Sequence, residues 1–209
     1  MKLTKYEHAC FTVEKDGEIL VVDPGGYTTD FIAPEGVVAV VITHIHGDHF
    51  DRDLLDSIID KNPGALIIGP EDVVKQIETF ETRPVDASDS VEVGGFNLEF
   101  FGGQHAVIHP SLPIAQNVGV MINDLIYYPG DSFATPDGRP VDTLALPVAG
   151  PWMKISEAID FALAVKPRFM FPTHDAVLSD VGRALPDGTV PKLVPESDYR
   201  RINGQTVEV

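Results

Sequence analysis

One turn of this chain reads Thr43-His44-Ile45-His46-Gly47-Asp48-His49 and places three histidines and one aspartate within six consecutive positions. It follows the continuous apolar run 37–42, which predicts a buried strand. It precedes residues 51–59, whose apolar side chains recur at helical spacing, with Asp51 or Asp53 available as the N-cap. The cluster is therefore predicted to lie in a strand-to-helix turn.

This concentration of imidazoles predicts a metal site. A folded core does not hold such groups dry and unpaired, because burying each polar group without a partner costs roughly 2–7 kcal/mol. A metal ion supplies the missing partner. His44 and His46 are close enough in sequence to share one ion, and Asp48 with His49 could turn toward a second.

Composition narrows the class of protein. The chain has 209 residues, of which 44% are hydrophobic, and this is ample for a single domain spanning residues 1–209. A formal net charge of −17 argues against nucleic acid or an anionic membrane as partner. A small anionic substrate is still compatible, because bound metal ions reverse the charge locally. The one cysteine, Cys10, excludes an internal disulfide.

The N-terminal segment 1–8 lacks the apolar core of a signal peptide, and no segment approaches the ~20 apolar residues of a membrane span. These features predict a cytoplasmic protein without a membrane partner.

Apolar runs separated by Gly, Pro and Asn/Asp signals predict mostly short strands. Residues 9–13 and 19–22 form a predicted hairpin around Asp16-Gly17. Further strands are expected at 65–68, 91–101, 116–123, 125–128, 144–146, 168–171 and 206–209, helices at 70–79 and 155–165, and a loop at 185–199.

This order of elements fits an α+β fold in which a two-layer sheet core is covered by helices. Polar residues recur where the predicted strands end, which is where open sheets carry their sites. These residues are Asp23, His44, His105, Asp131 and His174.

The pattern H-x-H-x-D-H at 44–49, then His105, Gly130-Asp131 and Pro172-Thr173-His174, resembles the metallo-β-lactamase superfamily along nearly the whole chain. The resemblance implies a four-layer αββα sandwich. Two mixed sheets would lie inside, helices would cover their outer faces, and two metal ions would lie at one edge.

The resemblance also implies a role for each matched residue. The first metal would be held by His44, His46 and His105, and the second by Asp48, His49 and His174. Asp131 would bridge both ions, and Asp23 would support the histidine turn from behind. The family implies hydrolysis by a metal-bridging hydroxide, with Asp48 and Asp131 as the carboxylates of the catalytic centre. Zinc is expected first, with manganese or iron also compatible with nitrogen and oxygen ligands.

Within the superfamily, the chain is most similar to the ascorbate-6-phosphate lactonase-like branch of metal-dependent hydrolases. Residues 6–11 look like its early G-H-S-x-F motif, and 147–153 with Glu157-Ala158 resemble its P-x-x-G…M…E-A segment. The closing turn and strand at 202–209 are also similar. The expected substrate is a small polar ester, lactone or phosphoester.

Several alternatives stay open at this level. The same ligands could hold two irons in a redox protein, or form a non-catalytic metal-binding module, although open coordination positions favour catalysis. His8, His109 and Trp152 could touch substrate. The alternatives are a hydrogen-bonded strand-end histidine for His8 and a packed apolar turn for Trp152. His109 is more often interpreted as a solvated loop histidine. A homo-oligomer is also possible.

Overall fold

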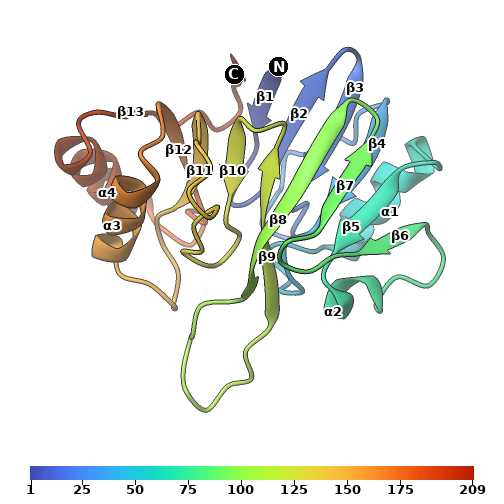
Figure 1. The fold of residues 1–209 in the computed structure, drawn as a ribbon, viewed down its shortest axis with the longest axis horizontal. Coiled ribbons are helices and arrows are strands. Elements are labelled where there is room, and N and C mark those ends of the chain that lie inside the picture. The colour runs from blue at the N-terminus through green and yellow to red at the C-terminus, as the bar shows by residue number, and fades with distance from the viewer.

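The computed structural model describes residues 1–209, and the strands form two seven-stranded sheets (Figure 1). The first sheet contains, in spatial order, β14 (Thr206–Glu208), β1 (Lys2–Lys5), β2 (Phe11–Lys15), β3 (Glu18–Val22), β4 (Val37–Val41), β5 (Leu66–Gly69) and β6 (Thr82–Pro84). The second contains β13 (Asp198–Tyr199), β12 (Phe169–Thr173), β11 (Thr143–Pro147), β10 (Ile126–Tyr128), β9 (Gln116–Ile122), β8 (Phe96–Gln104) and β7 (Ser90–Val93).

Four helices cover the outer faces of these sheets (Figure 1). Helix α1 (Arg52–Lys61) and the single turn α2 (Glu71–Val74) pack on the first sheet, while α3 (Ile155–Val165) and α4 (Asp180–Leu193) pack on the second. The predicted αββα sandwich of two mixed sheets is thereby confirmed. None of the helices combines the length and apolar character needed to cross a membrane.

The alternation of side chains along the strands produces three apolar layers. In and just after β4, Val40 and Ile42 point toward α1, whereas Ala39 and Val41 point toward the other sheet. Successive strand residues face opposite sides, so a continuous apolar run suits a strand buried on both faces. Between the sheets, the ring of Phe11 meets that of Phe171 edge-on, with centroids 5.9 Å apart.

Helix α1 begins at the position that the sequence predicts. Of the two candidate caps, Asp51 is the one used, because its side chain accepts a hydrogen bond of 2.9 Å from the backbone N–H of Leu54. This cap ends the histidine turn and fixes where the helix leaves it.

Two predicted segments are wrong. The expected loop at 185–199 is largely helical, because α4 runs through Pro186 and Pro191 after Ser179 caps it. Each proline lacks the backbone N–H that a helix interior uses, but the packing of Val190 against the second sheet compensates for the lost hydrogen bonds. The expected helix at 70–79 stops at Val74, after which tighter i→i+3 bonds turn the chain.

A third expectation needs refinement. Residues 91–101 are not one strand but the two arms of a hairpin, β7 and β8, paired in register from Val93 with Phe96. Gly94 adopts a left-handed φ of 53° in the tight turn between them.

The topology brings the strand ends together. Strands β3 and β4 are parallel, so their carboxyl ends lie at the same edge of the first sheet. In the second sheet β10, β11 and β12 are parallel, and β8 runs in the same direction across the antiparallel β9. Every strand that carries a predicted site residue therefore ends at one side of the sandwich.

Behind this edge, Lys5 is fully buried at the end of β1. Its Nζ donates to the carbonyl oxygens of Tyr6, at 2.6 Å, and His8, at 2.8 Å. Burial lowers the pKa of Lys5 from its ordinary value of 10.5 to about 8, against the opposing influence of Asp175. The ammonium group thus holds the loop at residues 6–8 at a cost in desolvation.

The Lys5→Met variant tests this cost. Because the folded-state pKa is the lower one, the unfolded chain binds more protons above pH 8, and the contribution of Lys5 to stability rises with pH. Between pH 7.5 and 10.5 we expect wild type to gain up to about 3 kcal/mol relative to the variant, measured by urea unfolding. A stability difference that does not change with pH would contradict the assignment.

Candidate metal centre

The structure brings all the predicted ligands together at the shared edge of the sheets. They form three overlapping groups whose nitrogen and carboxylate oxygen atoms lie within 4.8 Å of one another inside each group. The groups are His44, His46 and His105; His8, Asp48, His49 and His174; and His44, His49 and Asp131. The first matches the predicted first ligand set, and the second contains the predicted second set together with His8.

Asp131 lies at the centre of these groups. Its carboxylate oxygens are 2.9 Å from Nε2 of His174, 3.2 Å from that of His49 and 3.3 Å from that of His105. Nε2 of His44 is 3.9 Å away. One carboxylate thus faces imidazoles from both predicted sets, which is the position that a bridging ligand requires.

The histidine turn is held by Asp23, at the end of β3. Its carboxylate accepts three hydrogen bonds of 2.7 Å, from the backbone N–H and the hydroxyl of Thr43 and from Nδ1 of His49. The side chain is fully buried, and its backbone has a left-handed φ of 45°. Strained backbone of this kind persists only where surrounding contacts enforce it.

Hydrogen bonds on Nδ1 determine which nitrogen of three histidines is left for a metal. The Thr43 hydroxyl donates to Asp23, so it accepts from Nδ1 of His44 at 3.1 Å. Nδ1 of His49 donates to Asp23, and Nδ1 of His105 donates to the Ala106 carbonyl at 2.5 Å. In its neutral form, each ring therefore carries its lone pair on Nε2, which faces the cluster. Nε2 of His44 also lies 3.1 Å from Nδ1 of His46.

Several buried atoms in the cluster have no hydrogen-bond partner. They are Nε2 of His49 and His105, Oδ1 of Asp131, and both ring nitrogens of His174. The three Nε2 atoms lie 2.9 to 3.3 Å from the Asp131 carboxylate, but not in the alignment of a hydrogen bond. Buried polar atoms are nearly always paired, and orphaned ones carry a desolvation penalty of about 1–3 kcal/mol each. Bound cations would satisfy these atoms, so the residues present fit the metal ions that the sequence predicts.

The charges of the cluster also suit a cation. Burial alone would raise the pKa of Asp131, but the neighbouring His49, His105 and His174 hold it well below its usual range. Burial opposes protonation of His174, yet Asp131 and Asp48 raise its pKa to about 9. The carboxylates that stabilise a proton on His174 are the ones that would face a cation, so a bound metal ion would take the place of that proton.

His8 supports the cluster through Asp48. Its ring is fully buried, and Nδ1 accepts a hydrogen bond from the backbone N–H of Ala176 at 3.3 Å. The proton of the neutral ring therefore lies on Nε2, which donates to Asp48 at 3.0 Å. His8 also has a left-handed φ, of 53°, in the loop that Lys5 holds.

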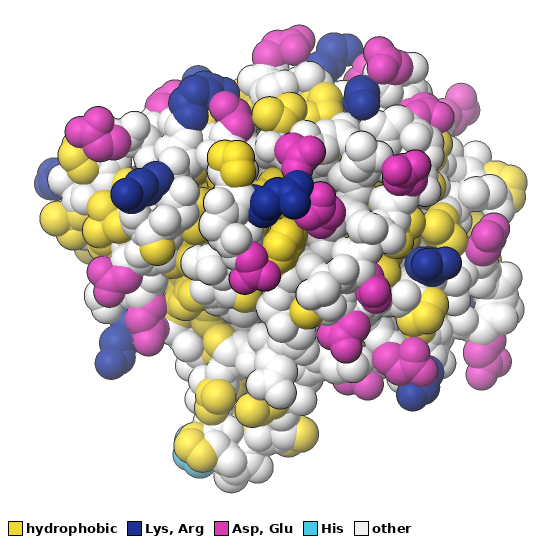
Figure 2. All heavy atoms as spheres, in the orientation of Figure 1, with side chains coloured by type: hydrophobic (Ala, Val, Ile, Leu, Met, Phe, Trp, Pro, Cys, Tyr) yellow, Lys and Arg dark blue, Asp and Glu magenta, His cyan; other side chains and the backbone are white.

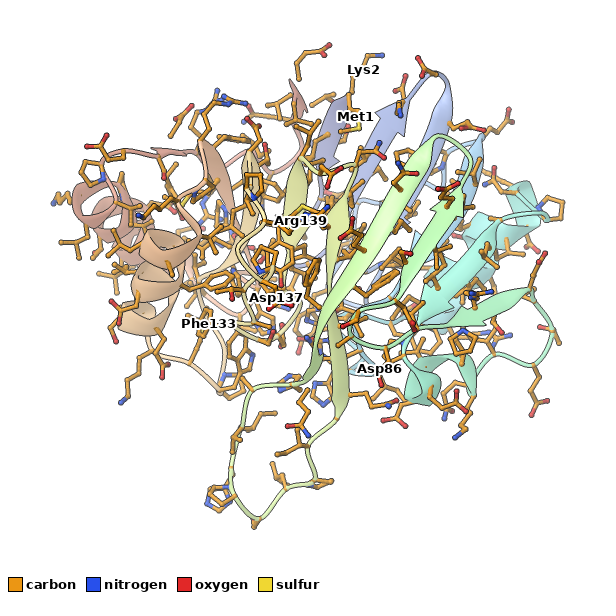
Figure 3. All side chains as sticks on the ribbon, in the orientation of Figure 1. Met1, Lys2, Asp86, Phe133, Asp137 and Arg139 are labelled. Carbon is orange, nitrogen blue, oxygen red and sulfur yellow. The ribbon has the colours of Figure 1, made fainter.

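Trp152 is buried in the wall of the site. Its indole N–H donates to the Asp131 carboxylate at 2.8 Å. The ring packs against Phe133, labelled in Figure 3, which in turn contacts Phe161 of α3. The indole thus orients Asp131 from the side of the second sheet.

His109 does not join the cluster. It is exposed in the loop 105–115, and its Nδ1 lies 2.7 Å from the Ser111 hydroxyl. It nevertheless lines a small groove together with His46 and His105.

The sequence interpretation missed two supporting residues. Asn117 in β9 accepts from the backbone N–H of Asp131 at 2.9 Å and donates to the Pro129 carbonyl, and so holds the Gly130-Asp131 turn. Gly25 packs directly against the backbone of Asp48 and His49, leaving no space for a side chain. The Pro24-Gly25-Gly26 run predicted a loop, but only the folded structure shows that this loop packs against the backbone of the histidine turn.

Comparisons of this chain with known proteins agree with the geometry of the cluster. The family model described as the beta-lactamase superfamily domain matches residues 2–174. This chain belongs to the metallo-β-lactamase superfamily. Protein Rv0786c of Mycobacterium tuberculosis, a relative, is 35% identical over 199 residues, and the match covers 92% of each chain.

Two further comparisons are consistent with this superfamily. A UPF0173 metal-dependent hydrolase of Carboxydothermus hydrogenoformans is 26% identical over 205 residues, covering 87% of this chain and 89% of the relative. The solved structure of Igni18, a metallo hydrolase of Ignicoccus hospitalis, superposes with a TM-score of 0.76 at 19% identity. That match covers 100% of this chain and 98% of Igni18, and it shows the fold. The predictions of superfamily membership and of a hydrolase are thereby confirmed.

Gly25→Ala tests the packing behind the superfamily's histidine turn. A Cβ at this position overlaps the backbone of Asp48 and His49, so the turn must shift. We expect zinc affinity, measured by chelator competition, to fall at least about tenfold.

Gly64→Ala is the matched control, because a Cβ there meets no atom within 4 Å. Equal zinc affinity in both variants would refute the role given to Gly25.

Proposed function

We propose that this protein is a dinuclear metal-dependent hydrolase acting on a small polar ester, lactone or phosphoester. The single observation that supports the proposal most strongly is the position of Asp131. Its carboxylate lies within 4 Å of Nε2 of four histidines that come from both halves of the chain.

In this proposal His44, His46 and His105 hold one ion, Asp48, His49 and His174 hold the other, and Asp131 is shared. The donor set of imidazoles and carboxylates suits zinc, manganese or iron. When bound, two divalent ions supply Lewis acidity and lower the pKa of a coordinated water toward ~7.

The chain's own residues position and charge this centre. Trp152 and Asn117 fix the side chain and backbone of Asp131, and His8 fixes Asp48. Two divalent ions carry four positive charges, while Asp48 and Asp131 bring two negative ones. The centre would therefore attract an anionic or strongly polarised group, although the protein as a whole carries −17.

Narrower features of the proposal come from the sequence. The motif-like segments at 6–11, 147–153 and 202–209 support placement in the ascorbate-6-phosphate lactonase-like branch. We further propose that residues 1–209 act as one catalytic domain in the cytoplasm. The di-iron redox protein is the rival that the same ligands allow.

Asp131→Asn tests the shared ligand. The amide keeps the shape of the carboxylate but removes its charge, so we expect loss of at least one metal per chain and a fall in turnover of about 100-fold or more. Elemental analysis and a panel of lactones, esters and phosphodiesters, assayed with zinc and manganese in turn, provide the measurements.

The exposed Asp137 offers the matched control, because Asp137→Asn makes the same change six residues away. Full turnover in Asp131→Asn after loss of both metals would sink the scheme. A stoichiometric pair of irons in untreated protein, with no hydrolysis of any panel substrate, would favour the redox rival.

His8→Asn tests the support of Asp48. Asparagine tolerates the left-handed backbone at this position but is too short to reach Asp48. We expect one of two metal-binding steps to weaken 10- to 100-fold while the other is unchanged, measured by chelator competition. His109→Asn, at an exposed histidine outside the cluster, should leave both steps unaltered. Two unchanged steps in His8→Asn would show that Asp48 does not need this bond.

A further inference from the structure

The loop 105–115 between β8 and β9 stands out from the body of the protein (Figure 1). It contains no charged residue, in a chain that is 22% charged. Its four large aliphatic side chains are between 38% and 52% exposed: Val107, Ile108, Leu112 and Ile114. Figure 2 shows apolar side chains gathered on this projection, whereas acidic groups are scattered over the body of the molecule.

The loop adjoins the metal centre. It begins with His105 itself, and one groove is lined by His46, His105 and the apolar residues of the loop. Its base is fixed by two backbone bonds, from His105 to the Ala115 carbonyl at 3.0 Å and from Ala106 to the Asp131 carbonyl at 2.8 Å. The part of a bound molecule that contacts the loop would therefore lie beside the part held at the metal centre.

The outer part of the loop is held much less firmly. Its own backbone bonds reduce to one, from Leu112 N–H to the His109 carbonyl at 3.0 Å, with His109 and Ser111 paired beside it. In Figure 3 the tip of the projection, with the side chains on it, lies away from the helices and sheets. The outer part of the loop therefore presents partly exposed apolar groups beside the metal centre.

We propose that this loop binds an apolar chain of the substrate, so that the hydrolysed group is an ester or lactone carrying an alkyl or acyl chain of several carbons. This inference rests on the proposed hydrolase function and narrows its substrate class. Binding sites typically combine an apolar wall with a few convergent polar groups, and here the aliphatic residues adjoin the metal-facing histidines. A second copy of the chain is the competing occupant of the loop, but the groove's continuity with His46 and His105 favours substrate.

The test uses straight-chain methyl esters from acetate to octanoate, with hydrolysis followed by pH-stat on the metal-loaded protein. Each buried methylene should raise kcat/KM by about two- to fourfold until the groove is filled. The double variant Leu112→Ser/Ile114→Ser should flatten this dependence while it still hydrolyses the acetate ester. Val181→Ser/Leu185→Ser on α4, where both residues are also well exposed, is the matched control and should retain the wild-type dependence.

A flat chain-length profile in wild type, or a steep one retained in the loop variant, overturns the proposal. A change of oligomeric state in the loop variant with an unchanged profile also overturns it and assigns the loop to a second copy.

If no ester is hydrolysed, the hydrolase proposal fails separately, and binding decides the role of the loop. Calorimetric titration with acetate through octanoate should then show affinity that rises with chain length in wild type and the α4 variant but not in the loop variant. Equal slopes in all three proteins would dismiss the loop as an apolar subsite.

Discussion

A buried carboxylate on β3 sets the geometry on which the site depends. Asp23 accepts hydrogen bonds from both polar groups of Thr43 and from Nδ1 of His49, and its side chain is fully buried. Through Thr43 the same carboxylate also fixes the tautomer of His44. One side chain thus joins two adjacent parallel strands and orients rings for both predicted ion positions, before any cation is considered.

The second half of the chain supplies the opposing charge. Asp131 is held by Asn117 and Trp152, and the surrounding imidazoles keep its pKa well below the ordinary range. His174 reaches it from β12 with a left-handed φ of 60°. Asp23 and Asp131 therefore act differently: the former orients ligands from behind, while the latter presents unpaired oxygen to the centre.

The sequence predicted those features that depend on local pattern. The order of elements indicated two sheet layers covered by helices, and polar residues at the strand ends indicated a shared edge. The resemblance of the histidine turn and the later motifs to a known superfamily then implied the sandwich and a cluster containing His105, Asp131 and His174. The sequence did not predict features that depend on contacts between segments far apart in the chain. Helix α4 forms despite two prolines because its packing against the second sheet stabilises it. The hydrogen bond from His8 to Asp48 joins residues that are 40 positions apart in the sequence. The exposed state of the loop 105–115 likewise requires the folded surface.

The two sheets share one plan, with three antiparallel and three parallel strand pairings in each. The first sheet is formed by residues 2–84 and the returning strand β14, and the second by residues 90–199. Cations at the shared edge would be bound by ligands from both sheets at once, and would therefore link the two units across their interface. By thermodynamic linkage, metal binding at this interface would then stabilise the packing of the two sheets, and that packing would strengthen metal binding. Chelation would loosen the architecture itself as well as the chemistry.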